Sequence, residues 1–531
     1  MISLYDILDA TGGQLFGEPA AQLFTSFNLD PTKSAPSSMF VAYRTVHGDS
    51  HQYIAEAIRN GATGVLCTRP PDCDTEGVSV IMVRRPVDAL LAWAHLVLGR
   101  MGTKVIAVTG SSGKSTTAAM IANVLSSKYR VHYQPVMVDG PISVPLALAT
   151  LTPEDEFCVL QLGVVRPGEM AAMVQAVQPE VGVITRVDYA HIDNFETIET
   201  IAQEKSLLIE YLSPQGLALL NYDDDLVREL GSQARANVET VSVERFGADW
   251  MAFNVIEGLN GTGFDLRHGD DRYKGRWIPL LGRHQLYPAL MAMAVGHYYD
   301  VDVNDALLTL KQISPLPGRM KPFVGIDNCL VVDDSYSANP QSTLAALDWL
   351  AAVKTDKLRT IFVMGDMEGL GHYSQYGHRT VGHRAADVAD YIITKGMDAA
   401  AIGRAALDKG YDPAHIRMLH SAEDVVTTLR QLNLNEHDIV LVKGGASARM
   451  EYVVDQLLQT EDDRELLVRH VVGKTINKRY EPSWIEIDTS ALAQNTRLIK
   501  SHVGEDVALM AIVKADGYGH GAVTAAQTAL L

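Results

Sequence analysis

The chain has 531 residues, and at about 150 residues per domain that length predicts three to four domains. It carries 45 Lys and Arg against 64 Asp and Glu, a net charge of −19, so we do not expect nucleic acid as a partner, because an acidic surface repels phosphate backbones. No apolar run is long enough for membrane insertion, and the N-terminus carries Asp6 and Asp9 where a signal peptide would be basic. These features predict a globular cytoplasmic protein.

The four cysteines are Cys67, Cys73, Cys158 and Cys329. They are too few and too widely spaced for a disulfide framework or a zinc site. We therefore expect them to act as small buried hydrophobic residues.

Two series of short β-branched strands alternate with helical segments, which is the pattern of a parallel sheet covered by helices. The expected strands are 104–108, 157–162, 181–185 and 217–221 in the first series, and 329–334, 360–365, 391–396 and 439–444 in the second. Residues 240–280 between them are polar and contain glycines, which predicts hairpins. The predicted fold class is therefore α/β.

Domain boundaries follow from changes in this pattern. Residues 84–99 have helical periodicity and lead into the first series of strands, so we set the first boundary near Met101. A charged stretch over 461–482 predicts a linker, after which a strand at 484–488 and a helix at 491–503 begin a further unit over 483–531.

The strongest chemical signal is the segment KVIAVTGSSGKSTTAAMIANVL (104–125), in which a strand enters a glycine-rich turn and a helix opens with Lys114. Backbone N–H groups of such a turn can hold a polyphosphate, Lys114 can neutralise its terminal charge, and the Ser115 hydroxyl can bind Mg²⁺. Val108 stands where the generic phosphate loop has its first glycine, so this is the shorter GxxGKS form. The segment predicts nucleotide phosphoryl transfer.

The loop TGSSGKST (109–116) resembles the ATP loop of the Mur ligases, the ATP-dependent amide ligases of peptidoglycan synthesis. Six further stretches follow the motif order of that family: LGVVRPGEM (162–170), AHIDNFETIETIAQEKSLLIE (190–210), PGRMK (317–321), DDSYSANPQS (333–342), MGDMEGLG (364–371) and VKGGASARME (442–451). The resemblance spans roughly residues 1–460, and the motifs best match the branch that adds D-alanyl-D-alanine.

This resemblance implies three domains: a UDP-sugar-binding domain at 1–100, a central ATP-binding phosphate-loop domain with a parallel sheet at 101–317, and a Rossmann-like domain at 318–460. It also implies the reaction. The γ-phosphate of ATP passes to the carboxylate of a UDP-N-acetylmuramoyl peptide, and the amine of D-alanyl-D-alanine attacks the resulting acyl phosphate. ATP and Mg²⁺ are the implied cofactors.

The same resemblance assigns roles to single residues. The ATP-binding set is Thr109, Gly110, Ser111, Ser112, Gly113, Lys114, Ser115, Thr116, His284, Asp334 and Asn339. The catalytic set is Lys114, Lys205, His191 and Arg319, and the metal ligands are Ser115, Gln161, His191 and Lys205. Lys205 would be carbamylated, which turns a cation into a carboxylate-like ligand. Arg319 would reach the phosphates from the third domain, so the site would assemble only when domains close.

Several positions depart from the pattern of the family. Its metal-binding Glu is Gln161 here, and a neutral amide offsets less Mg²⁺ charge than a carboxylate, unless Glu169 fills that role. The other departures are Pro31 and Thr32 at the nucleotide-sugar position, Gln285 and Pro288 near the adenine position, Ser112 and Ser337 in place of Asn, and Gly369 at a Glu position that Glu368 precedes by one residue.

Two interpretations of these departures remain open. One is a diverged but active ligase, and the other is a ligase-derived scaffold that binds nucleotide or a partner without turnover. The intact phosphate loop and Lys205 favour activity, because a protein that only binds needs no carbamylated lysine.

Residues 484–526 resemble the start of a fold-type III alanine racemase, with Lys514 of VKADGYGHG at the Schiff-base position for pyridoxal phosphate. We expect a strand at 508–514 that ends at this lysine. About 48 residues of a barrel that needs about 250 are present. We therefore expect no racemase activity from this chain alone and pyridoxal phosphate only in a complete racemase domain. Either a truncated fusion or a fragment of a longer, bifunctional product fits the sequence.

Overall fold

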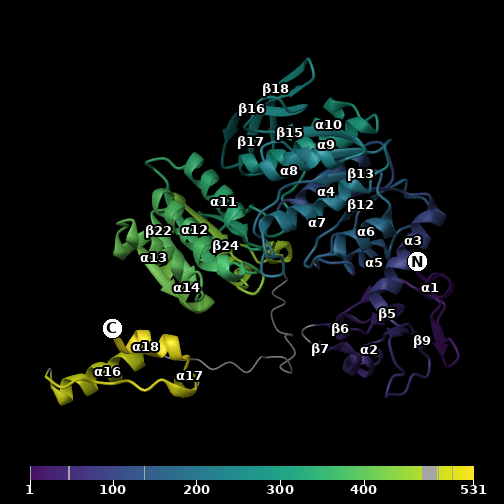
Figure 1. Ribbon diagram of the computed structural model, residues 1–531. Helices are drawn as coiled ribbons and strands as arrows, with labels where there is room; N and C mark the ends of the chain where they lie inside the picture. Colours follow the sequence, from purple (N-terminus) through teal and green to yellow (C-terminus); the bar gives the residue numbers. More distant parts are fainter. Residues whose placement is uncertain are drawn as a thin grey trace. The chain divides into compact units, whose positions relative to one another are not determined.

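A computed structural model describes residues 2–45, 48–136, 138–468, 487, 489–504, 506–518 and 520–530. The chain forms two compact units, Met1–Val471 and Val472–Leu531. The first unit contains three sheets of five or more strands with helices packed on them, as Figure 1 shows, and two short two-stranded sheets. The α/β class predicted from the sequence is confirmed.

The N-terminal sheet has five strands in the order β2-β9-β8-β5-β4. Its strands are β2 (Gln14–Phe16), β4 (Ser26–Asn28), β5 (Ser38–Val41), β8 (Gly64–Cys67) and β9 (Ser79–Met82), and the helices of this region are α1 (Leu4–Thr11), α2 (Ile54–Arg59) and α3 (Pro86–Met101). Short strands pair beside it: β1 (Ile2–Ser3) with β3 (Leu23–Phe24), and β6 (Arg44–Thr45) with β7 (Gly48–Asp49). All neighbours in the sheet are parallel except β2 and β9.

The central sheet has nine strands in the order β11-β12-β10-β13-β14-β15-β16-β17-β18. They are β10 (Lys104–Thr109), β11 (Val131–His132), β12 (Phe157–Gln161), β13 (Val181–Ile184), β14 (Leu217–Asn221), β15 (Asn237–Ser242), β16 (Trp250–Glu257), β17 (Thr262–His268) and β18 (Asp271–Ile278). The sheet is parallel up to β16 and antiparallel beyond it. The predicted hairpins therefore exist, and they extend the parallel sheet.

Helices cover this central sheet and connect its parallel strands. They are α4 (Lys114–Ser126), α5 (Ser143–Leu148), α6 (Glu169–Val177), α7 (Ile198–Glu210), α8 (Asp225–Leu230), α9 (Leu286–Tyr298) and α10 (Val303–Leu310). Strands β10, β12, β13 and β14 are almost wholly buried because both faces of a parallel sheet are covered. This burial explains their continuous apolar sequences.

The third sheet has six strands in the order β19-β20-β24-β21-β22-β23, all parallel except β19. They are β19 (Lys321–Val324), β20 (Leu330–Asp334), β21 (Arg359–Gly365), β22 (Tyr391–Lys395), β23 (Ile416–Leu419) and β24 (Asp438–Lys443). Its helices are α11 (Pro340–Val353), α12 (Ser374–Val388), α13 (Ala400–Asp408), α14 (Ala422–Gln431) and α15 (Glu451–Asp455). The four strands predicted for the second series are all present.

The second unit differs from its predicted structure in one place. Helix α16 (Thr489–Val503) confirms the helix expected at 491–503, whereas the strand expected at 484–488 lies outside the described residues except for residue 487. Residues 508–513 are not a strand, and Lys514 begins a short helix, α17 (Lys514–Tyr518), which α18 (Ala522–Leu530) follows. A parallel strand needs a neighbour to accept its backbone hydrogen bonds, and the described residues of this unit contain no strand to pair with.

The structure bears on the expected burial of the cysteines and on the expected lack of membrane-spanning helices. Cys67, Cys158 and Cys329 are buried as expected, whereas Cys73 is partly exposed. Within the described ranges, every helix is too short or too polar to cross a membrane.

Candidate active site

The glycine-rich loop lies between the end of β10 and the start of α4, and two glycines give it its shape. Gly110 has φ 148° and Gly113 has φ 83°, backbone conformations that favour glycine. A Cβ at Gly110 would lie 1.9 Å from Thr185 Oγ1 and 3.1 Å from the Arg186 backbone nitrogen. The loop is therefore held tightly against the end of β13.

Gly110→Ala should lower the melting temperature and weaken ADP binding, because the backbone is strained and the new methyl group collides with Thr185. We expect a cost of roughly 1–3 kcal/mol, as for other forced positive-φ residues. Thermal unfolding with and without ADP measures it. The control is Gly99→Ala in α3, where a Cβ meets nothing within 4 Å, so this variant should be as stable as the parent or more stable. Equal melting temperatures for both variants would contradict the account of the loop.

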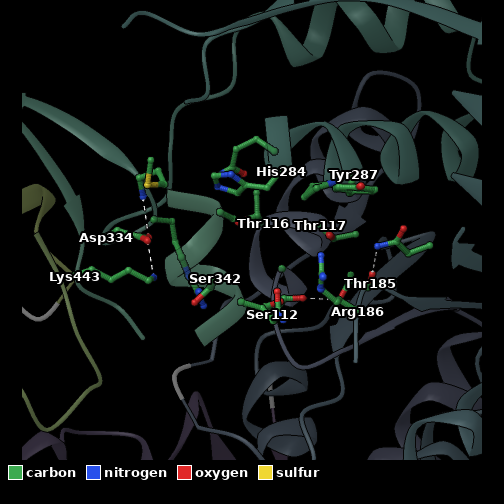
Figure 2. Close-up of a pocket in the computed structure, with 18 residues that line it drawn as sticks. Ser112, Thr116, Thr117, Thr185, Arg186, His284, Tyr287, Asp334, Ser342 and Lys443 are labelled. Atoms are coloured by element: carbon green, nitrogen blue, oxygen red, sulfur yellow. Dashed lines mark hydrogen bonds and ion pairs between the residues drawn. The ribbon is translucent and has the colours of Figure 1, made fainter. Parts of the chain in front are cut away.

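A cavity beside this loop has walls from both the central and the third sheet, and Figure 2 shows its lining residues. The residues are Ser112, Gly113, Thr116, Thr117, Thr185, Arg186, Asn221, His284, Gln285, Tyr287, Pro288, Arg319, Met320, Asp334, Gln341, Ser342, Ala345 and Lys443. We call it the nucleotide cavity. Most of these residues follow the carboxyl ends of parallel strands, where ligands bind in open α/β sheets.

The nucleotide cavity contains polar atoms that the described protein leaves unsatisfied. Thr117 Oγ1, Arg186 Nε, His284 Nδ1 and Arg319 Nε are buried without a hydrogen-bond partner. Burial lowers the pKa of His284 to about 4, so its imidazole is neutral at pH 7. Buried polar atoms without partners are costly, so their clustering in one cavity fits a polar ligand such as a nucleotide.

A second cavity meets the first at the same loop, and we call it the phosphate cavity. Its lining residues are Ser111, Ser112, Gly113, Lys114, Ser115, Val136, Val138, Asp139, Gln161, Ala190, His191, Arg319, Tyr336, Ser337, Ala338, Asn339, Glu368, Gly445 and Ala446. Lys114 Nζ donates to the Gly110 carbonyl oxygen at 3.1 Å and lies 3.8 Å from Asp139 Oδ1. The lysine is thus held over the loop whose backbone would bind phosphate.

Ser115 and Gln161 form a short polar chain at the helix start. Ser115 Oγ donates to Gln161 Oε1 at 2.9 Å, and Gln161 Nε2 donates to the Tyr133 hydroxyl oxygen at 3.2 Å. Burial raises the pKa of Tyr133 to about 12, so the phenol remains protonated and neutral. The amide oxygen of Gln161 therefore points at the hydroxyl that the phosphate-loop pattern assigns to Mg²⁺.

Asp139 lies between two cationic or potentially cationic side chains. Its Oδ2 is 3.7 Å from His191 Nε2, on the side opposite to its contact with Lys114. Partial desolvation raises the pKa of this carboxyl, but the charge of Lys114 and the hydrogen bond to His191 outweigh it and hold the pKa well below the usual range. Asp139 is therefore an anion in the phosphate cavity.

Lys205 is buried on α7, with 3% of its surface exposed. Burial and the nearby charge of Lys114 lower the pKa of its amine to about 7, against the opposing effect of neighbouring carboxylates. The adjacent Glu204 does not neutralise it by a hydrogen bond, because its carboxylate accepts from the backbone nitrogens of Gly168 and Met170. A neutral amine at physiological pH is the form that reacts with CO₂.

Side chains from the third sheet contact the phosphate loop region directly. Arg319 Nη2 donates to Ser115 Oγ at 3.4 Å, and its guanidinium stacks on the Tyr336 ring at 3.9 Å. Asn339, the N-cap of α11, donates from Nδ2 to Asp188 Oδ1 at 3.2 Å. These contacts join the loops after β13 and β20 within one compact unit.

Asp334 is paired rather than free in the nucleotide cavity. Its Oδ2 accepts from Lys443 Nζ at 2.5 Å, and its Oδ1 accepts from the Met320 backbone nitrogen. Lys443 also donates to the Ser337 carbonyl oxygen at 3.0 Å. The pair fixes the loop that carries Asn339 against the end of β24.

Most residues of the predicted ATP-binding, catalytic and metal sets line one of the two cavities, and three of them, Thr109, Gly110 and Lys205, do not. Thr109 is buried and donates its hydroxyl to the Leu162 carbonyl oxygen, which pins β10 to β12. Lys205 is buried near the phosphate cavity and interacts electrostatically with Lys114 and Asp139 of its lining. Gly110 allows the loop to pack against Thr185 and Arg186. Glu169 accepts from the backbone nitrogens of Val165 and Arg166, so it caps its own loop and does not contact Ser115.

Four further residues line these cavities or hydrogen-bond to their lining residues, and they have no role in the predicted set. They are Tyr133, Asp139, Asp188 and Lys443. Lys443 is the last residue of β24 and lies in the expected strand 439–444, so its place at the strand end was a usable signal. The other three have no motif spacing that points to them.

No group of three or more His, Cys, Asp or Glu side chains in the described ranges is arranged to hold a metal ion. Mg²⁺ commonly keeps several waters and takes only one or two carboxylates plus substrate phosphates. The oxygens of Ser115 and Gln161 in one cavity suit such a nucleotide-borne cation.

Lys514 does not fit a pyridoxal phosphate site in the described residues. It is exposed at the start of α17, and the segment before it is not a strand. In a barrel enzyme the reactive side chains project from strand ends.

The fold and the two cavities define a nucleotide-binding α/β enzyme with a phosphate loop. Residues 108–296 match the model of the Mur ligase middle domain, residues 318–446 that of the Mur ligase, glutamate ligase domain, and residues 487–531 that of the alanine racemase N-terminal domain.

Curated relatives cover nearly all of the first unit. The UDP-N-acetylmuramoyl-tripeptide–D-alanyl-D-alanine ligase of Escherichia coli is 30% identical over 464 residues, which are 86% of this chain and 98% of the relative. The ligase of the same name from Bacillus subtilis is 26% identical and covers 81% of this chain and 92% of its own length.

Solved structures agree with this match. MurF from Acinetobacter baumannii superposes with a TM-score of 0.75 at 25% identity, covering 86% of this chain and 99% of that one. MurF from Thermotoga maritima in complex with ADP gives a TM-score of 0.69 at 25% identity, covering 83% and 98%. The chain therefore belongs to the Mur ligase family of ATP-dependent ligases.

Proposed function

We propose that the first unit joins D-alanyl-D-alanine to the peptide of a UDP-N-acetylmuramoyl peptide, with ATP as the energy source. The observation that carries this proposal is the joint cavity at the loop 110–115, where Lys114, Asp139 and His191 meet Arg319 from the third sheet. The names of the curated relatives supply the substrates. The domain division at 1–100, 101–317 and 318–460 is part of the same proposal.

In this proposal each side chain has one task. Lys114 and Arg319 stabilise charge on the transferring phosphoryl group from opposite sides of the loop, because positioning and electrostatics supply most of this catalysis. Carboxylate activation as an acyl phosphate leaves the carbonyl carbon open to the amine of the dipeptide. Phosphate is then released as the amide forms.

The nucleotide cavity would hold the adenosine part of ATP. The neutral His284 can hydrogen-bond a base through Nδ1, and Thr117 and Arg186 offer unpaired donors along the same wall. Pro288 lines this wall where an amide side chain would add a donor, so shape and His284 must supply the base recognition.

Mg²⁺ bound here would neutralise the phosphates and orient the transferring group. Ser115 and Gln161 would hold it through neutral oxygens, together with His191 of the cavity lining and a carbamylated Lys205, which is buried nearby. Burial of Lys205 supports carbamylation, because it favours the neutral amine over the ammonium ion.

Gln161→Glu should lower the Mg²⁺ concentration that gives half-maximal activity several-fold, because a carboxylate oxygen replaces an amide oxygen beside Ser115. A Mg²⁺ titration of phosphate release at saturating ATP measures the effect. The control is Gln175→Glu on α6, the same substitution at an exposed position, and it should leave the titration unaltered. An unchanged midpoint in the Gln161 variant would remove this residue from the metal site.

The function is tested by phosphate release from ATP over a matrix of UDP-muramoyl peptides and D-amino-acid dipeptides. We expect release only when both partners are present, with the highest rate for D-alanyl-D-alanine. Nucleotide binding without release for any pair would instead support a scaffold that binds without turnover, the alternative that the neutral Gln161 favours.

For the second unit we propose a link to D-alanine supply. Residues 487–531 match the alanine racemase N-terminal domain, so a longer product of the same gene would carry both activities. Sequencing of the transcript beyond the codon for Leu531 tests this proposal. A stop codon at that point would contradict it.

A further inference from the structure

One carboxylate in the phosphate cavity has no role in the proposed ligand set. Asp139 lies in the loop between β11 and α5, with Oδ1 3.8 Å from Lys114 Nζ and Oδ2 3.7 Å from His191 Nε2. It lines the same cavity as Ser115 and Gln161. Its side chain is 35% exposed, so a ligand in the cavity can reach it.

The backbone beneath this carboxylate makes room for it. A Cβ added at Gly163 would lie 1.6 Å from Asp139 Oδ1 and 2.4 Å from its Cγ. Gly163 comes two residues after Gln161, where the chain leaves β12. The Asp139 carboxylate therefore rests on the backbone of the segment that carries Gln161, in a position that any other residue at 163 would obstruct.

The neighbouring acidic side chains cannot take the same place. The Glu169 carboxylate accepts hydrogen bonds from the backbone nitrogens of Val165 and Arg166. Glu368 accepts a hydrogen bond from the Ser447 backbone nitrogen across the cavity. Gln161 is neutral, and its amide is fixed by Ser115 and Tyr133. Among the described lining residues, Asp139 is the carboxylate beside the phosphate loop.

We propose that Asp139 supplies the anionic oxygen ligand for the divalent cation of the bound nucleotide, so that the negative charge expected at position 161 is supplied from position 139. The proposal rests on the proposed function only in taking a metal-bound nucleotide as the ligand of these cavities. Gln161 then contributes a neutral oxygen and Ser115 a hydroxyl. The total charge around the cation is conserved although the residue at the family's Glu position is an amide.

The test measures Mn²⁺ binding in the presence of ADP, by electron paramagnetic resonance of free Mn²⁺, and needs no turnover. Asp139→Asn keeps the side-chain shape and removes the charge. We expect it to weaken Mn²⁺ binding about 10-fold to 100-fold, the range typical of losing a supporting group at a metal site. The matched control, Asp193→Asn, removes a nearby carboxylate whose residue contacts the Gly369 loop, and it should bind Mn²⁺ like the parent.

The decisive variant combines Asp139→Asn with Gln161→Glu. It returns the carboxylate to position 161, and we expect it to restore Mn²⁺ binding to within a few-fold of the parent. Unchanged binding in Asp139→Asn, or a loss that the second substitution does not repair, would overturn the proposal. Thermal unfolding without metal checks that each variant folds.

The outcome is separable from that of the ligase assay. A protein that binds Mn²⁺ with ADP through Asp139 but joins no peptide would retain this inference and lose the proposed function. If the parent protein joins the peptides and the Asp139→Asn variant binds Mn²⁺ like the parent, the proposed function is retained and this inference is lost.

Discussion

Lys114→Ala should reduce the phosphate release that depends on both peptide substrates by about 10²–10³-fold, a loss of about 2.7–4 kcal/mol if the lysine acts like one oxyanion donor. The reason is its position: Nζ lies over the loop at 3.1 Å from the Gly110 carbonyl oxygen, where it would meet the terminal phosphates. Steady-state rates at saturating Mg²⁺ measure this loss.

A matched control for this variant is Lys128→Ala. Lys128 follows the end of α4, is exposed, and donates to the Asp300 carbonyl oxygen, far along the helix from the loop. We expect its kinetics to match the parent. Substrate-dependent release that survives in Lys114→Ala would rule out the assignment of the loop as the site of phosphoryl transfer.

If the proposed function holds, Lys205→Ala should abolish nearly all ligase activity, because it removes the group that would become an anionic metal ligand on carbamylation. In the parent protein the carbamate requires the neutral amine, and burial lowers the pKa of Lys205 to about 7. At pH 8 about nine in ten such amines are neutral, compared with under about one in a hundred at an ordinary lysine pKa. Below pH 7 the amine becomes protonated, and the carbamate should be lost.

The carbamate is checked by ¹³C nuclear magnetic resonance and by the dependence of ligase activity on CO₂. ¹³C nuclear magnetic resonance with labelled bicarbonate should show one carbamate signal at pH 8 that weakens as the pH falls through 7 and is absent in Lys205→Ala. The control is Lys357→Ala, which removes an exposed lysine and should leave the carbamate signal unchanged. A carbamate signal that persists in Lys205→Ala, or activity independent of CO₂, would contradict the assignment.

The parallel strands of the central and third sheets could largely be predicted from the sequence because the buried ones are continuous apolar runs. In the third sheet these runs also end at or beside Gly or Asp, as in β20, β21 and β24. Strand β11, Val131–His132, has two residues and is too short to leave a pattern. The hairpins after β15 were predictable as hairpins, but their pairing with a parallel sheet depends on contacts distant in sequence.

The candidate site was predictable where a residue belongs to a local motif and hidden where it does not. Lys114 and Ser115 open a helix after a strand, which any reader of the sequence can recognise. Asp139 lies in a loop with no such spacing, and its place in the cavity depends on a bare glycine backbone that comes 24 residues later. Tertiary packing of this kind leaves no periodic signal.

In the segment before Lys514 the sequence predicts a strand that the structure does not contain. Its apolar and β-branched sequence predicts a strand, yet residues 508–513 have no regular structure. Strand propensity mainly reports how well a side chain packs against neighbouring strands, so it cannot create a strand where none is available for pairing.

The nucleotide cavity also has a consequence for cooperative unfolding. Its walls come from Thr117 on α4 and Arg186 after β13, which belong to the central sheet region, and from Asp334 and Lys443 on the third sheet, so the cavity disappears when either region unfolds. A nucleotide bound there stabilises both sheets by the same free energy, about 2.7 kcal/mol at a concentration 100 times its Kd. Two sheets that melt separately in the free chain would then melt together in a single calorimetric transition.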